Sequence, residues 1–316
     1  MWRRRRKGNR VLRQIAAMLL VVACLLPTGA RAACSVEAKA TVPLGTADNV
    51  LTLPVQVNGI TATFVLDTGA QRSLVSMEAV QRLGLTRDPW VGTTMSGIGG
   101  IDRRPNADPR SLSLGGVTLV RRTLNHDNSL TVGILPRPRV GNRVIDGLLG
   151  RDFLSVFDLD LDMPGARLTL FHVHDCAGRF LPWQGDYTSV PVSVPTGQAL
   201  VLPVTLDGTP LRALLDTGSS ASLVARPGMF RLGLQPSRLA ADPAKAFSGL
   251  GPRSVVMRLH RFRTLQVGQQ VIQAPLLWVA PIRLSPIVDM LLGVDWLVGR
   301  RIWISFATRQ IFVAGR

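Results

Sequence analysis

The chain has 316 residues, of which 46% are hydrophobic, and a formal net charge of +17. Eight basic and no acidic residues fall within residues 1–32, so the rest of the chain carries +9 (17 less 8). This charge is almost all arginine, is spread along the sequence and accompanies no nucleic-acid-binding signature. The composition therefore argues against a nucleic acid partner and leaves attraction to anionic surfaces open.

The first 32 residues have the features of a signal peptide. An apolar run of 12 residues, Ile15–Leu26, follows a basic segment and precedes Ala30-Arg31-Ala32, a small-x-small cleavage site. The run is shorter than the roughly 20 residues that span a membrane. We expect residues 1–32 to be removed and the protein to be exported, either periplasmic or secreted. Lipoprotein processing at Cys24 and an uncleaved leader stay open, and membrane contact is expected only through such an anchor.

Two cysteines remain after the leader, Cys34 and Cys176. In an oxidising compartment two cysteines most simply form a disulfide, which here ties the mature N-terminus to the segment after the first half of the chain. A competing interpretation is a metal site, because His172, His174 and Cys176 alternate along a predicted strand and share a face. No fourth ligand is evident in the sequence nearby, so no metal is expected.

A hairpin is predicted after residue 50. Leu51–Val57 alternates, Asn58-Gly59 is a strong two-residue turn signal, and Thr61–Leu66 returns. The second strand ends in Asp67-Thr68-Gly69. A carboxylate directly after a buried strand is costly unless it is paired, hydrogen-bonded or neutralised, so Asp67 is either a turn cap or a functional group.

The same pattern returns 149 residues later as Asp216-Thr217-Gly218, so the chain contains an internal repeat. Two triplets with matching flanks favour a functional role over a turn cap. The matching segments are 58–59 with 207–208, 82–85 with 231–234, 96–99 with 248–251, and 146–154 with 289–297. Their offset changes only between blocks, where loops absorb insertions.

At these residues the sequence resembles the retropepsin-like aspartic peptidases, in the single-chain bacterial form with two fused half-sites. The specific parts are the two triplets and two downstream blocks, Leu148-Leu149-Gly150 and Leu291-Leu292-Gly293. The resemblance implies a mainly β, bilobal aspartic-protease (retropepsin/pepsin-like) fold with an internal pseudo-twofold repeat. Each downstream block is then a strand against the catalytic loop, followed by a short helix. The resemblance also implies an endopeptidase that acts on peptide or protein substrates as a monomer, with no cofactor.

The repeat divides the expected chain into an N-terminal lobe (33–175), an inter-lobe connection rich in Pro and Gly (176–199) and a C-terminal lobe (200–316). By resemblance, two glycine-rich stretches are the flaps that close over substrate, although ordinary surface turns stay open as an alternative. Their residues are Gly97, Ile98 and Gly99 in the first lobe and Gly249, Leu250 and Gly251 in the second. Tyr187, the only tyrosine, falls in the connection, so neither flap carries the tyrosine typical of pepsin-like enzymes.

Short helices are predicted after the triplets. Ser76 is the expected N-cap of the first, with Gly84 at its end, and Pro227 is expected near the first turn of its counterpart. Asp152 and Asp295 are expected to cap the helices that follow the downstream blocks.

The two triplet carboxylates, Asp67 and Asp216, are the predicted catalytic pair. Hydrolysis of an amide needs a water made nucleophilic and a proton for the leaving nitrogen. Two adjacent carboxyls that share one proton supply both, which is the established aspartic-protease pattern. By resemblance, Thr68 and Thr217 hydrogen-bond across the axis, and Gly69 and Gly218 allow a tight backbone with N–H groups near the carboxylates.

The two half-sites differ in detail. Ser219 follows the second triplet and is expected to donate to its carboxylate, whereas Ala70 has no hydroxyl. This asymmetry predicts a working pH less acidic than that of enzymes with hydroxyls on both sides. Arg151 follows the first downstream glycine, where the second lobe has Val294. The main functional alternative is a catalytically silent peptide-binding module of the cell envelope.

Overall fold

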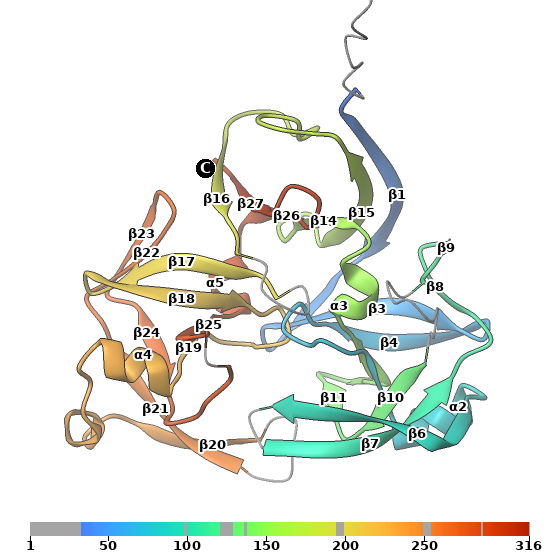
Figure 1. The fold of residues 1–316 in the computed structure, drawn as a ribbon, viewed down its shortest axis with the longest axis horizontal. Coiled ribbons are helices and arrows are strands. Elements are labelled where there is room, and N and C mark those ends of the chain that lie inside the picture. Colours follow the sequence, from blue (N-terminus) through green and yellow to red (C-terminus); the bar gives the residue numbers. More distant parts are fainter. Residues whose placement is uncertain are drawn as a thin grey trace, which may run out of the picture.

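The computed structural model of the chain describes residues 33–97, 100–120, 129–135, 138–193, 199–248, 254–285 and 287–315. Two β-rich lobes lie side by side, and a third sheet lies against both of them (Figure 1). The predicted mainly β, bilobal fold is therefore confirmed. The predicted signal peptide, with Cys24, lies outside the described residues. Within the described ranges, no helix has the length and apolar character needed to cross a bilayer.

The sheet of the N-terminal lobe has the strand order β6-β7-β10-β5-β13-β4-β3-β8-β9, with β2 paired to β3. Its strands are β2 (Gly45–Ala47), β3 (Val50–Val57), β4 (Ile60–Leu66), β5 (Leu74–Ser76), β6 (Thr86–Gly97), β7 (Gly100–Asp108), β8 (Leu112–Leu114), β9 (Val117–Thr118), β10 (Leu130–Gly133) and β13 (Gly147–Leu149). The same lobe contains the helix α2 (Met77–Arg82) and the small ribbon of β11 (Arg139–Val140) and β12 (Arg143–Val144).

The sheet of the C-terminal lobe has the order β20-β21-β24-β19-β25-β18-β17-β22-β23. Its strands are β17 (Val201–Leu206), β18 (Thr209–Leu215), β19 (Leu223–Val224), β20 (Ala244–Ser248), β21 (Ser254–Arg261), β22 (Thr264–Val267), β23 (Gln270–Gln273), β24 (Leu276–Val279) and β25 (Met290–Leu292). Helix α4 (Arg226–Arg231), with Pro227 in its first turn as predicted, and the 3-10 helix η3 (Pro236–Leu239) accompany it.

The internal repeat is visible in the strand orders, which correspond element for element from β7 to β9 and from β21 to β23. The hairpin that opens each repeat turns where the sequence predicts. Asn58 and Gly59 have φ of 52° and 78°, and Asp207 and Gly208 have φ of 49° and 83°. Positive φ at both central residues is the tight turn that Asn-Gly and Asp-Gly favour, because its twist matches that of the flanking strands.

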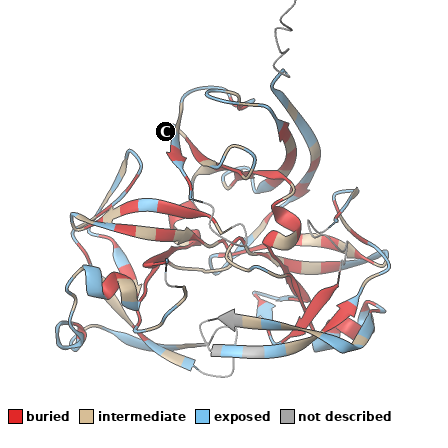
Figure 2. Ribbon diagram, in the orientation of Figure 1, coloured by how far each residue is buried: buried red, intermediate tan, exposed pale blue. Residues whose placement is uncertain are grey.

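A third, six-stranded sheet combines strands from the beginning, the middle and the end of the described chain, in the order β1-β15-β14-β26-β27-β16. Its strands are β1 (Ser35–Pro43), β14 (Asp158–Asp162), β15 (Arg167–His174), β16 (Tyr187–Pro191), β26 (Arg301–Ser305) and β27 (Gln310–Ala314). The antiparallel pair β14 and β26 joins the two repeats at its centre. One hydrophobic core therefore continues from each lobe into this sheet, and buried residues line all three parts (Figure 2).

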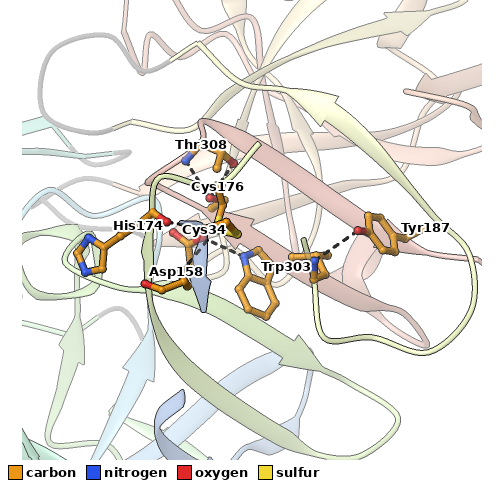
Figure 3. Close-up of a disulfide and its surroundings, with 10 residues drawn as sticks. Cys34, Asp158, His174, Cys176, Tyr187, Trp303 and Thr308 are labelled. Carbon is orange, nitrogen blue, oxygen red and sulfur yellow. Dashed lines mark hydrogen bonds between the residues drawn. A yellow bond between two sulfur atoms is a disulfide. The ribbon is translucent and has the colours of Figure 1, made fainter. Parts of the chain in front are cut away.

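The disulfide predicted between Cys34 and Cys176 is present, with Cα atoms 4.4 Å apart across 142 positions of sequence (Figure 3). It closes the end of the β1–β15 pair, where Ser35 lies opposite His174. The metal alternative for Cys176, His172 and His174 is therefore wrong, because this sulfur is bonded to Cys34. Within the described ranges, no group of His, Cys, Asp and Glu is arranged to hold a metal ion.

The helix caps were predicted with mixed success. Ser76 caps α2 and its hydroxyl accepts from the Ala79 N–H at 3.1 Å, as expected. The predictions for Asp152 and Asp295 are wrong, because glycines occupy the N-cap positions of α3 (Arg151–Leu154) and α5 (Val294–Leu297). Both aspartates instead bind serines of the neighbouring triplet loop, a contact that local capping rules do not anticipate.

Candidate active site

Two equivalent loops leave the sheets at the junction of the lobes. Strand β4 ends at Leu66 and β18 ends at Leu215, so each delivers the next residue, an aspartate, to the junction. The downstream strands support these ends, since β13 runs parallel to β4 and β25 runs parallel to β18. The backbone N–H of Asp67 donates to Leu149 and that of Asp216 donates to Leu292, each at 3.0 Å. This confirms the expected strand beside each loop and the short helix after it.

The threonines join the two loops through four buried hydrogen bonds. The Thr217 hydroxyl accepts from the Thr68 N–H at 2.9 Å and donates to the Leu66 carbonyl at 2.8 Å. The Thr68 hydroxyl accepts from the Thr217 N–H at 3.1 Å and donates to the Leu215 carbonyl at 2.9 Å. We call this set the threonine interlock. Both threonines are fully buried, so each bond is protected from competition with water.

The interlock brings the two carboxyl groups together, and their side chains hydrogen-bond to each other. Each triplet glycine faces the opposite carboxyl group. A Cβ on Gly69 would lie 2.4 Å from Cγ of Asp216, and one on Gly218 would lie 2.3 Å from Cγ of Asp67. Glycine is therefore required at both positions by the close approach of the two half-sites.

Both carboxyl groups are buried at the junction of the lobes, and burial raises their pKa values. Burial, followed by the adjacent charge of Asp67, raises the pKa of Asp216 to about 8. Burial also raises the pKa of Asp67, but the N–H groups of Ala70 and Gly69 and the charge of Arg151 oppose that rise. The Ala70 N–H donates to Oδ1 of Asp67 at 2.8 Å, and the Gly218 N–H donates to Oδ1 of Asp216 at 3.0 Å. The pair is thus arranged to retain one proton near neutral pH.

The expected hydrogen bond from the Ser219 hydroxyl to the Asp216 carboxylate is not formed. The Ser219 hydroxyl donates instead to the Ala221 carbonyl at 2.8 Å. Residue types alone do not reveal this choice of acceptor.

Arg151 supplies an asymmetry whose role the sequence did not reveal. Its guanidinium is buried and donates to the carbonyls of Gly69 and Ala70, each at 3.3 Å. Burial lowers the pKa of this arginine, while the charges of Asp67 and Asp216 favour its cationic form. The equivalent Val294 has no charge, so only one of the two loops is held by a cation.

A serine–aspartate hydrogen bond lies behind each triplet loop, and the sequence analysis did not predict either one. The Ser73 hydroxyl donates to Asp152 at 2.7 Å and accepts from the Gly150 N–H at 2.8 Å. Ser222 and Asp295 form the same 2.7 Å contact in the second lobe. The repeat in the sequence could have indicated them, because Ser73 corresponds to Ser222 at the offset of 149 and Asp152 corresponds to Asp295 at the offset of 143.

Hairpins occupy the positions expected for flaps. Strands β6 and β7 pair up to Gly97 opposite Gly100, and β20 and β21 pair up to Ser248 opposite Ser254. The two hairpins extend toward each other across the same side of the molecule (Figure 1). The predicted tips, Ile98 with Gly99 and Gly249 to Gly251, lie outside the described residues, so their contact with substrate stays a prediction.

The bilobal β fold and the paired carboxyl groups at its pseudo-twofold junction define an aspartic-protease-type architecture. A family model described as "Aspartyl protease" matches residues 53–153 and 202–296, so it covers both repeats and more than half of the chain. The chain belongs to the aspartyl protease family, and its activity is that of a protease, a hydrolase.

Comparisons with individual proteins add little to this assignment. A crystal structure of an aspartic proteinase from Irpex lacteus is similar, with a TM-score of 0.49 and 12% identity over 89% of this chain and 97% of that one. No curated protein sequence matches this chain.

Proposed function

We propose that the protein is an exported aspartic endopeptidase of the single-chain, retropepsin-like type, and that Asp67 and Asp216 are its catalytic residues. The observation that carries this proposal is the hydrogen-bonded pair of carboxyl groups held at the junction of the lobes by the threonine interlock. The absence of any tyrosine in either flap hairpin supports the retropepsin-like type.

In the proposed mechanism, Asp216 holds the shared proton in the free enzyme and Asp67 carries the negative charge. Two features support this placement: the raised pKa of Asp216, and the hydrogen bonds that Arg151 donates to the Gly69 and Ala70 carbonyls of the Asp67 loop. Asp67 then accepts a proton from a water bound between the carboxyls as the water oxygen attacks the peptide carbonyl carbon. Asp216 donates its proton to the substrate oxygen, which gives a neutral tetrahedral diol.

Breakdown of the diol completes the reaction. The proton gained by Asp67 passes to the leaving nitrogen as the C–N bond breaks, while the diol returns a proton to Asp216. The products are one carboxylic acid and one amine, so the single water is consumed and the dyad regains its starting state. Gly97 to Gly99 and Gly249 to Gly251 would close over the substrate from the flap hairpins.

Export is supported by the basic, apolar N-terminal segment and by the disulfide, which is stable in an oxidising compartment. We place the protein in the periplasm or outside the cell, as a monomer in which the two lobes act as an intramolecular dimer. Mass spectrometry of the mature N-terminus tests the leader directly. Cleavage after Ala32 supports this placement. A lipidated Cys24 would instead mean an exported protein tethered to a membrane, and a cytoplasmic protein that retains residues 1–32 would contradict export.

The catalytic proposal is tested with a mixed peptide library and three purified proteins: the native chain, Asp67→Asn and Asp216→Asn. We expect internal cleavage by the native protein and none by either variant. The substitutions are nearly isosteric, so both variants are expected to fold. Unfolding curves identify any variant that does not. Peptide binding without cleavage by the native protein would instead support a catalytically silent binding module. The pH–rate profile is expected to peak well above pH 3. At pH 3 an ordinary carboxyl group, with a pKa of about 4, is still mostly protonated.

A further inference from the structure

Arg72 lies on the loop that follows the first triplet, and its side chain reaches the flap hairpin of the same lobe. It is five positions beyond Asp67, and its Nη2 donates to the Thr93 hydroxyl at 3.4 Å. Thr93 belongs to β6, four residues before the end of that strand at Gly97. The Thr93 hydroxyl in turn donates to the buried Asn106 at 2.8 Å, which fixes its position. The Arg72 side chain therefore spans the distance between the catalytic loop and the hairpin.

The Arg72 guanidinium is only weakly bound in this position. Its 3.4 Å bond to Thr93 is longer than an ordinary N–H···O hydrogen bond of roughly 2.7–3.2 Å. Its Nε is shielded from solvent and has no hydrogen-bond partner, and no carboxylate in the described part of the chain pairs with it. The side chain is half-buried, and its Nη1 stays open to solvent. A cation that is desolvated on one edge and lacks a counter-charge attracts an anion to its open edge.

The second lobe shows that the loop can form without this arginine. At the offset of 149 the equivalent residue is Ala221. A Cβ on Gly150 would lie 3.0 Å from the Arg72 carbonyl carbon. A Cβ on Gly293 would lie 2.6 Å from the Ala221 carbonyl carbon, so the backbone takes the same path in both loops. The serine–aspartate hydrogen bond behind each loop also forms in both lobes. Arg72 is therefore available for a role other than holding the loop.

We propose that Arg72 is a specificity-determining residue that binds an aspartate or glutamate side chain of the substrate on one side of the scissile bond. This inference rests on the proposed function, in which the substrate lies between the flap hairpins and the paired carboxyls. A planar guanidinium donates two parallel N–H bonds to a carboxylate, and such charge-assisted bonds are short and strong. Because Ala221 carries no charge, the preference that Arg72 creates falls only on the side of the first lobe.

The test uses a peptide that the native protein cleaves, taken from the mixed library. Its termini are acetylated and amidated, so that side chains supply the only carboxylates. A scanning set places Glu or Gln in turn at each position around the scissile bond, at about pH 6, where Glu is ionised. The measured quantity is the ratio of kcat/KM for the Glu peptide to kcat/KM for the Gln peptide. We expect one position, or adjacent positions, where the native ratio is about tenfold or more, equivalent to about 1.4 kcal/mol.

Variants then assign this ratio to Arg72. Arg72→Gln should reduce it to below about twofold. Arg72→Lys keeps the charge but not the planar fork, so it should give an intermediate ratio. The matched control is Arg110→Gln, which removes one exposed arginine from the same lobe and should keep the native ratio. The Arg110 N–H donates to Asn58, at the opposite end of β4 from Asp67 and roughly 20 Å away at the rise of a strand.

The inference fails if no position in the native scan prefers Glu, a result that needs no variant. It also fails if Arg72→Gln lowers kcat/KM equally for both peptides and leaves the ratio unchanged, because Arg72 would then bind the peptide backbone or support the loop. Should Arg72→Gln not fold, an unchanged ratio in Arg72→Lys has the same meaning. An equal fall of the ratio in Arg110→Gln would indicate general attraction to the basic surface and counts against the inference.

The same scan separates this inference from the proposed function. Cleavage of the peptides without any Glu preference overturns the role of Arg72 and leaves the endopeptidase proposal intact. Absence of cleavage of every peptide by the native protein overturns the endopeptidase proposal and the role of Arg72 with it.

Discussion

The threonine interlock should contribute measurably to both stability and activity. Replacing Thr217 with valine keeps the shape of the side chain but removes its hydroxyl. The buried N–H of Thr68 then loses its acceptor at 2.9 Å, and the Leu66 carbonyl loses its donor at 2.8 Å. Each buried polar group left unpaired costs about 1–3 kcal/mol. The expected loss in free energy of unfolding is therefore roughly 2–6 kcal/mol.

Thr217→Ser is the matched control, because it keeps the hydroxyl and removes only a methyl group. Its expected cost is about 1 kcal/mol. Urea unfolding of the native protein and both variants gives the free energies, and peptide hydrolysis gives kcat/KM. The valine variant should also lose activity by about tenfold or more, since a displaced loop separates the carboxyl pair.

The reasoning fails if the valine variant is no less stable than the serine variant. It also fails if Thr68→Val, which removes the two pseudo-symmetric bonds, leaves stability unchanged. Equal stability with lost activity would show that the interlock positions the loops without holding the lobes together, and the stability estimate would then be wrong.

Three further outcomes follow from the structure. Because the pKa of Asp216 is raised to about 8, the proton it retains stabilises the folded state at low pH, and this contribution is lost as the pH rises toward 8. The free energy of unfolding, measured with urea at a series of pH values, should therefore fall over this range, and it should fall less in Asp216→Asn. Arg151→Met removes a cation that lowers the pKa of Asp67, so the acidic limb of the kcat/KM profile should move to higher pH. Replacing Cys34 and Cys176 with serine opens a link across 142 positions and should lower stability by about 2–5 kcal/mol, measured by thermal unfolding with and without reductant.

Each of these has its own contrary result. An unchanged slope in Asp216→Asn would show that the pair does not hold a proton in the folded state. An unshifted acidic limb in Arg151→Met would remove the arginine from the electrostatics of the site. Equal melting temperatures with and without reductant would mean that the β1–β15 pair needs no covalent link.

The sequence by itself determined the local features and the repeat. The Asn58-Gly59 and Asp207-Gly208 turns, the Ser76 cap and the disulfide all follow from residue types whose preferences act over a few positions or from a simple count of cysteines. The bilobal fold followed from the repeated triplets and from resemblance. These inferences succeeded because backbone conformation at a turn or cap depends mainly on the residues that form it.

Tertiary structure alone decided the rest. Asp152 and Asp295 belong to a residue type that is favoured at helix N-caps. Their carboxylates instead accept hydrogen bonds from Ser73 and Ser222, which lie on other loops. The six-stranded sheet joins β14 to β26, and the threonine interlock joins Thr68 to Thr217. Such contacts depend on which surfaces folding brings together, and a hydrogen bond or a charge pair is set by distance in space rather than by position in the chain.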